Sequence, residues 1–193
     1  MPRSPARRPD RARLRELLDR LARLVGSDRS GDDLNPVQRA ALVYLSRANR
    51  FSRSPSQVAD YLLATRGTVS QTLRSLARKG LVTERRSETD RRSIAYEPTG
   101  EGAALARGAD AVDAAVDALD DSSAAALSDA VESLLRDALA ARGGRSFGVC
   151  RTCRHHRPVE GRGGGARCAL LEVDLSADEA GRICHEHAWG DAA

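Results

Sequence analysis

The fold of this chain is decided by residues 65–82, which read TRGTVSQTLRSLARKGLV. Val69, Leu73 and Leu76 recur at steps of three and four, so this stretch predicts a helix with one apolar face. Lys79 and Gly80 end that helix, because a cation suits the last turn and glycine accepts left-handed backbone. The opposite face is short, polar and basic, and we expect it to carry Thr68, Gln71, Arg74, Ser75 and Arg78.

Two earlier start signals predict further helices. Ser54-Pro55 begins a short helix that we expect to end near Leu63, because serine caps free backbone N–H groups and proline suits a first turn. Asn35-Pro36 has the same signal and predicts a helix to about residue 49. A turn near residues 64–65 then separates two helices, which is typical of a helix-turn-helix.

Strand-forming residues follow the helix-turn-helix. Residues 81–85 and 93–97 have the composition of short strands and flank the polar tip 86–92. Together they predict a β-hairpin immediately after the second helix, which is the position of a wing.

Apolar residues at helical spacing also occur on both sides of this unit. Leucines recur through residues 11–25, and alanine-rich helices are predicted over 100–119 and 122–142. We therefore predict a disordered basic arm over 1–10, one helical domain over 11–143, and a separate cysteine-rich module over 144–193, which follows Gly143 and Gly144.

The strings at 65–82, 90–93 (DRRS) and 99–102 (TGEG) resemble the winged helix-turn-helix of MarR-type transcriptional regulators, and the resemblance covers most of residues 11–142. It implies a mainly α-helical fold with a small β-hairpin wing, and long helices that form a homodimer. A two-fold dimer would bind double-stranded DNA at a pseudo-palindromic operator whose half-sites lie about one helical turn apart. We expect a regulator of this kind to be a repressor.

The resemblance also implies roles for individual residues. The helix that ends at Lys79 and Gly80 would enter the major groove, with its first turn on a phosphate. In the wing, Asp90 would orient Arg92 in the minor groove, and Arg85, Arg86 and Arg91 are phosphate candidates. Pro98 stands where the family commonly has leucine, so we expect a shortened wing. The predicted DNA-binding residues are Thr65, Arg66, Gly67, Thr68, Ser70, Gln71, Arg74, Arg78, Arg86, Asp90, Arg91 and Arg92.

The C-terminal module contains every cysteine of the chain. Cys150 and Cys153 have the spacing with which two thiolates reach one metal, and Cys168 and Cys184 can complete a set of four. We expect one metal site per chain, with zinc as the favoured metal and an iron–sulfur cluster or metal-free redox thiols as alternatives. The four histidines, at positions 155, 156, 185 and 187, rank behind the cysteines as ligands.

Composition sets limits on the function. The 193 residues are 41% hydrophobic and 30% charged, with a net charge of +4, which permits a nucleic-acid partner without requiring one. No apolar run approaches the roughly 20 residues of a membrane span, and the N-terminus has no secretory signal, so we expect a cytoplasmic protein. No catalytic triad, phosphate loop or paired-carboxylate site is recognisable, so we expect no enzyme.

The sequence therefore favours a dimeric DNA-binding regulator that responds to metal or redox state through its cysteines. Two rivals stay open. One is an iron–sulfur redox or electron-transfer protein, and the other is a regulator that senses a small aromatic ligand while its cysteines are purely structural.

Overall fold

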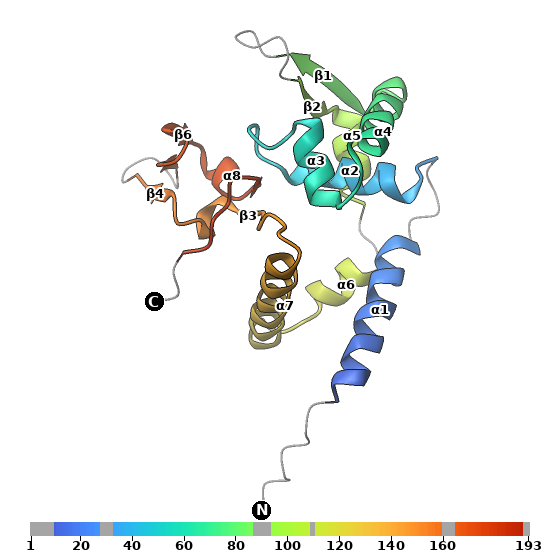
Figure 1. Cartoon of the computed structure of the whole chain (residues 1–193), viewed down its shortest axis with the longest axis vertical. Helices are drawn as coiled ribbons and strands as arrows, with labels where there is room; N and C mark the ends of the chain where they lie inside the picture. Colours follow the sequence, from blue (N-terminus) through green and yellow to red (C-terminus); the bar gives the residue numbers. More distant parts are fainter. Residues whose placement is uncertain (1–9, 28–32, 87–93, 109–110, 160–164, 191–193) are drawn as a thin grey trace, which may run out of the picture. The chain divides into compact units, whose positions relative to one another are not determined.

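A computed structural model describes residues 10–27, 33–86, 94–108, 111–159 and 165–190 of the chain. The chain divides into two compact units, which are described separately (Figure 1). One unit comprises Met1–Asp33 and Ala109–Ala125, and the other comprises Leu34–Gly108 and Ala126–Ala193. The predicted arm over 1–10, apart from Asp10, lies outside the described residues, as do Asp90, Arg91 and Arg92.

The first unit contains α1 (Arg11–Ser27) and α6 (Ala111–Asp117), which contact each other. The leucine stripe predicted a helix over 11–25, and α1 confirms it. Most apolar side chains of α1 are nevertheless exposed: Leu14, Leu17, Leu21, Leu24 and Val25. The leucine stripe is therefore largely exposed in a single chain.

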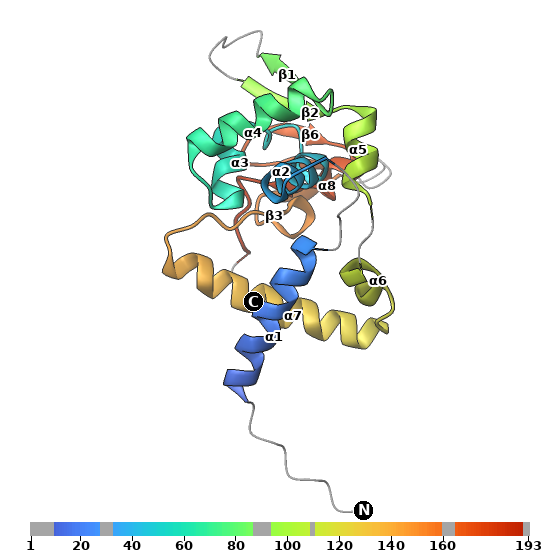
Figure 2. The same cartoon turned by 90° about the vertical axis from the view of Figure 1, so that its right-hand side faces the viewer.

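The core of the second unit is built by α2 (Pro36–Arg47), α3 (Pro55–Leu62) and α4 (Arg66–Arg78). Asn35 and Ser54 each accept a hydrogen bond from a backbone N–H in the first turn, so both predicted start signals act as N-caps. Figure 2 shows α2 with α3 and α4 to one side and α5 (Gly100–Ala106) to the other. The largest buried side chains of this core are Tyr44, Leu42, Leu45, Leu73, Leu76, Val58 and Val69.

The predicted wing follows α4 directly. Gly80 has a φ of +72°, the left-handed value that ends the helix, and the chain then enters β1 (Val82–Arg86). β1 pairs antiparallel with β2 (Ile94–Pro98) in a register that joins Val82 to Pro98 and Arg86 to Ile94. Pairing thus reaches Pro98 and ends there, and the mainly helical fold with a β-hairpin wing is confirmed.

One long predicted helix is wrong. The expected helix over 100–119 is divided into α5 and α6, which belong to different units. The Arg107 N–H donates to the carbonyls of Ala103 and Ala104, and the Gly108 N–H donates to the Leu105 carbonyl, so the last turn of α5 is tightened. The helix stops before Gly108, because glycine is a poor helix former. The other predicted helix, over 122–142, is present as α7 (Asp121–Ala141).

The C-terminal segment forms short strands and turns. β3 (Gly148–Val149) pairs antiparallel with β7 (Ile183–Cys184), and a second sheet has the order β4 (His156–Pro158), β5 (Ala166–Cys168), β6 (Val173–Leu175). The short helices η1 (Cys150–Thr152) and α8 (Ala177–Ala180) connect them. This tail shares the compact unit of the helix-turn-helix, since Ile183 forms a parallel bridge with Ala48.

Among the helices of the described ranges, none has the length and apolar character needed to cross a bilayer.

Candidate functional site

The first turn of α4 has a regular N-cap. The Thr65 side chain accepts a hydrogen bond from the backbone N–H of Thr68 at 3.1 Å, and the two hydroxyl oxygens lie 2.8 Å apart. Arg66 and Gly67 are exposed beside them. A Cβ at Gly67 would meet only Thr65 Oγ1, at 3.9 Å, so the fold does not require glycine there. The lack of a side chain nevertheless leaves the backbone accessible. This turn can accept an anion, because helix N-termini carry partial positive charge.

The outer face of α4 is polar and lies over a completely buried apolar face. Gln71, Arg74 and Arg78 are exposed and Ser70 is half-buried, whereas Val69, Leu73 and Leu76 have no exposed surface. The helical period therefore predicted both faces correctly, with one exception. Ser75 differs from its prediction: it is half-buried and its Oγ accepts a hydrogen bond from Gln38 Nε2 at 3.0 Å, which ties α4 to α2.

A cavity of about 600 Å³ borders this outer face, between the start of α2 and α4. The sequence did not indicate that residues of α2 would lie beside Gln71 and Arg78. A nucleic acid on α4 would also meet the start of α2, since the cavity is lined by Asn35, Pro36, Val37, Gln38, Thr68, Gln71, Thr72, Ser75 and Arg78.

The arginines of the wing have acidic partners on the same hairpin. Arg86 Nε lies 3.1 Å from Glu84 Oε1, and Arg85 Nε lies 3.2 Å from Glu97 Oε2. The Tyr96 hydroxyl also donates to Glu84, at 3.1 Å. Because both arginines are exposed, a phosphate could displace these carboxylates at small cost. Asp90, Arg91 and Arg92, the predicted tip, lie outside the described residues.

The four cysteines of the tail are free thiols. Cys150, Cys168 and Cys184 are buried and Cys153 is half-buried. Burial, with smaller contributions from the charges of the other three thiols, raises the pKa of Cys150 to about 11. In the part of the chain that the structure describes, no three Cys, His, Asp or Glu side chains are grouped so that they could hold a metal ion.

Hydrogen-bond donors surround two of the sulfur atoms. Burial raises the pKa of Cys184, while hydrogen bonds from the Asn49 side chain, the Glu186 backbone and the Ser52 hydroxyl oppose that rise. The Ala188 N–H lies 3.4 Å from Cys153 Sγ. Donors of this kind stabilise a thiolate and help to orient it.

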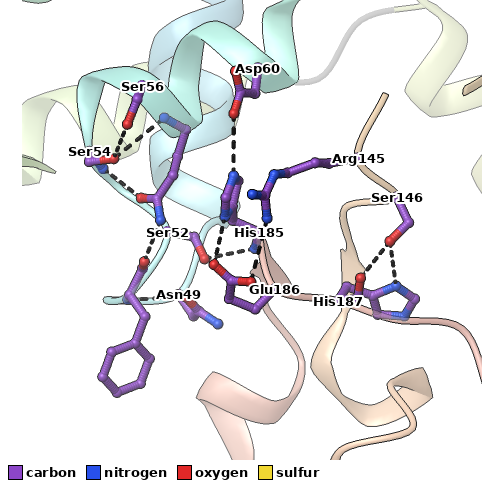
Figure 3. A network of polar contacts seen from close by, with 12 residues as sticks. Asn49, Ser52, Ser54, Ser56, Asp60, Arg145, Ser146, His185, Glu186 and His187 are labelled. Atoms are coloured by element: carbon purple, nitrogen blue, oxygen red, sulfur yellow. Dashed lines mark hydrogen bonds and ion pairs between the residues drawn. The ribbon is translucent and has the colours of Figure 1, made fainter. Parts of the chain in front are cut away.

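Two of the donors to Cys184, Asn49 and Ser52, belong to the loop between α2 and α3. Figure 3 shows Asn49 and Ser52 beside His185 and Glu186. The His185 N–H donates to Ser52 Oγ at 2.9 Å, and His185 Nε2 lies 3.4 Å from Asp60 Oδ2 on α3. The tail is therefore bonded to the helix-turn-helix at the position of one of its cysteines.

Sequence reasoning missed the part played by two histidines. His185 is buried, and its ring packs against Phe147 with centroids 5.1 Å apart. His187 is also buried, with its Nε2 atom 3.1 Å from Thr152 Oγ1, and burial lowers its pKa. These two residues anchor the tail to its surroundings. Residue type alone does not distinguish a histidine with this structural role from one that binds a metal.

Residues 32–93 match the model of the MarR family. Among solved structures, FabT of Streptococcus pneumoniae in complex with DNA is 25% identical with a TM-score of 0.53, over 66% of this chain and 96% of that chain. The wild-type apo form of MarR from E. coli is 20% identical with a TM-score of 0.50, over 67% of this chain and 99% of that one.

A third solved structure, the DNA complex of S. aureus MepR, is 19% identical with a TM-score of 0.51, over 68% of this chain and 99% of that chain. No curated protein sequence matches the chain. The winged helix-turn-helix described above is therefore similar to that of the MarR family.

Proposed function

We propose that this chain is a dimeric, sequence-specific DNA-binding transcriptional regulator of the MarR type. The observation that carries the proposal is the outer face of α4, where exposed polar side chains cover a fully buried apolar face directly before a β-hairpin wing. The similarity to FabT, which is solved in complex with DNA, supports it.

We assign a role in DNA binding to each residue from its exposure and its side-chain chemistry. Arg74 and Gln71 are exposed near the middle of α4, and their side chains can form paired hydrogen bonds with the edges of guanine and adenine. The capped turn at Thr65 and Thr68 would hold a phosphate. Arg86 would contact the backbone from the wing. Base contacts would then set the sequence while phosphate contacts set the register.

The exposed apolar side chains of α1 and α7 support a dimer in which these helices pack against a second copy of the chain. None of the described side chains of α7 is buried, and four of its large apolar residues are about half exposed: Leu127, Val131, Leu134 and Leu135. The stripe on α1 is exposed to a similar degree. Apolar surface of this extent on two helices favours association, and a closed two-fold dimer is the commonest form.

Selection from a library of random DNA duplexes tests sequence-specific dimeric binding. We expect enriched duplexes to share a pseudo-palindrome whose half-sites are about 10 base pairs apart from centre to centre. A library that remains random after several rounds, with binding that depends only on salt, would contradict the proposal.

We further propose that the chain represses transcription, because a dimer that covers an operator excludes other proteins from the same DNA. A reporter driven by a promoter that contains the selected duplex should lose activity when the wild-type chain is produced. The Arg74→Ala variant should restore most of it. Activity that rises with the wild-type chain would instead identify an activator.

We also propose that the tail makes DNA binding responsive to metal or thiol oxidation. Support comes from the contacts that join Cys184 and His185 to Ser52, in the loop before α3. Operator affinity should fall after chelation or mild oxidation and recover after metal addition or reduction. Unchanged affinity would leave the cysteines with a structural role only.

A further inference from the structure

We infer that a cavity between the end of α2 and the tail binds a phosphate group through the guanidiniums of Arg47, Arg151 and Arg182. Both walls belong to the second compact unit. The cavity has a volume of about 530 Å³, within the roughly 300–1,000 Å³ of small-molecule sites. None of its lining residues in the described ranges belongs to α4 or is a cysteine, so the site is separate from the proposed DNA-binding face and from the thiols.

Backbone hydrogen bonds hold together the three segments that carry these arginines. β3 pairs with β7, and the Cys150 N–H donates to the Arg182 carbonyl at 3.1 Å, next to Arg151 in the chain. Ile183 forms a bridge with Ala48, directly after the end of α2. The backbones at positions 47, 151 and 182 are therefore fixed relative to one another, although they are far apart in the sequence.

Two of the three arginines of the cavity lack an acidic partner. Arg182 Nε lies 2.7 Å from Asp178 Oδ2, so these two residues have no net charge together. Arg47 and Arg151 are exposed, and neither forms an ion pair within the described parts of the chain. Three guanidiniums and one carboxylate give the lining a net charge of +2. A phosphate group carries a charge between about −1.5 and −2 at neutral pH, which complements this value.

The end of α2 opposes an anion less than a bare helix end would. Carbonyl groups at the C-terminal end of a helix carry partial negative charge. Here Arg182 Nη1 donates to the Ser46 carbonyl at 3.1 Å, and Arg53 Nη2 donates to the Ala48 carbonyl at 2.9 Å. Two carbonyls of this helix end are therefore already bonded to cations.

One hydroxyl of the cavity wall has no partner. Ser46 lines the cavity, and its Oγ is buried without a hydrogen bond to any described residue. Buried hydroxyl groups are normally bonded, so this part of the wall has unused hydrogen-bonding capacity.

The Arg151 guanidinium lies where only a glycine leaves room for it. A Cβ on Gly181 would be 2.6 Å from Arg151 Nη2, which is closer than such atoms approach. The guanidinium therefore lies against the backbone of the turn after α8, and its planar fork of N–H donors suits two phosphate oxygens. Val149 and Ile183 add apolar surface to the lining, which can contact the body of a phosphate monoester.

Calorimetric titration of the wild-type chain with inorganic phosphate at constant ionic strength tests the site. We expect saturable binding of one phosphate per chain with a millimolar or lower dissociation constant. A parallel titration with phenyl phosphate separates two sources of the group. Tighter binding of phenyl phosphate would indicate a phosphorylated small molecule, and equal or weaker binding would indicate the free ion. Absence of saturable binding for both anions would overturn the site.

A pair of arginine variants tests the role of the cavity. Arg151→Gln should weaken phosphate binding by roughly 10-fold or more, because it removes a charged hydrogen-bond donor. Arg154→Gln is the matched control, since Arg154 is exposed in the same tail and does not line the cavity. Equal losses for the two variants would show a general attraction between charges and would overturn the site.

A pair of glycine variants tests the geometry without any change of charge. Gly181→Ala should weaken phosphate binding several-fold, because its methyl group displaces the Arg151 guanidinium. The backbone there has a φ of −86° and a ψ of −4°, which alanine adopts in ordinary turns. Gly190→Ala is the control, since a Cβ at Gly190 meets nothing within 4 Å. Unchanged phosphate affinity in Gly181→Ala would overturn the placement of Arg151 in the site. These titrations contain no DNA, so their outcome is independent of the proposed operator binding.

Discussion

The Tyr44 hydroxyl illustrates how single polar groups hold the loop between α2 and α3. It donates to the Ser52 carbonyl at 2.6 Å, and the side chain is 1% exposed. Its ring also packs on Tyr61, with centroids 4.3 Å apart. The hydroxyl thus supplies a hydrogen-bond donor to a buried carbonyl that would otherwise have none.

Tyr44→Phe should lower the free energy of unfolding by about 1–2 kcal/mol, because it leaves that carbonyl without its partner. Chemical denaturation measures the loss, and Tyr61→Phe, on a more exposed ring, is the control. Equal stability of Tyr44→Phe and the wild type would contradict the importance of this hydrogen bond.

The same residue predicts a dependence on alkaline pH. Burial raises the pKa of Tyr44 well above its usual value, so the folded chain keeps the phenol protonated, whereas the unfolded chain ionises it near pH 10. This contribution to stability is complete below about pH 10 and is lost as the pH rises further. Denaturation between pH 9 and 11 should show a steeper loss for the wild type than for Tyr44→Phe.

Arg74 tests the outer face of α4. Arg74→Ala should weaken binding to a selected operator by about 1–3 kcal/mol, because it removes a base contact as well as a charge. Arg107→Ala removes the same charge from an exposed position at the end of α5. Fluorescence anisotropy with labelled duplex measures both affinities, and equal losses would indicate a purely electrostatic effect.

Sequence patterns predicted exposure along α4 better than they predicted partners. Arg74 and Gln71 could be placed on the outer face because helical periodicity depends on neighbours three and four residues away. The bond from Gln38 to Ser75 spans 37 residues, and the bond from His185 to Ser52 spans 133. No local pattern encodes contacts over such distances.

At the scale of secondary structure, α5 depends on one close approach to the segment between α4 and β1. A Cβ on Gly102 would lie 2.0 Å from the Leu81 carbonyl oxygen and 3.2 Å from Leu42 Cδ1. The start of α5 can therefore pack on Leu81 and on α2 only while position 102 lacks a side chain.

Gly102→Ala should lower the free energy of unfolding by at least about 1–3 kcal/mol, since the backbone must move to admit a methyl group. Gly100→Ala is the control, because a Cβ there meets nothing within 4 Å, and its effect should stay within about 0.5 kcal/mol. Thermal unfolding of both variants measures the difference, and a tolerated Gly102→Ala would contradict this packing.

The elements that the sequence predicted well are those with strong local signals. Caps at Asn35 and Ser54, together with apolar periodicity, sufficed for α2 and α3. The division between α5 and α6 was missed because alanine-rich sequence favours helix on both sides of Gly108. The tail strands, which are only 2 or 3 residues long, are set by pairing around the cysteines rather than by strand propensity.

At the scale of the whole molecule, the exposed leucines of α1 and α7 predict the oligomeric state. The wild-type chain should have twice the mass of one chain in light scattering, and Leu17→Glu combined with Leu134→Glu should reduce it to one chain. Leu170→Glu is a matched control, because Leu170 is exposed in the tail. A wild-type monomer at micromolar concentration would contradict the dimer.

The measurement that tests the central claim most directly is the ratio of the dissociation constants for a shuffled duplex and a selected operator, titrated at physiological salt. We expect a ratio of at least about 1,000 for the wild-type chain. Alanine at both Gln71 and Arg74 should lower the ratio mainly by weakening operator binding. A ratio near one for the folded wild-type chain would contradict sequence-specific DNA recognition by α4.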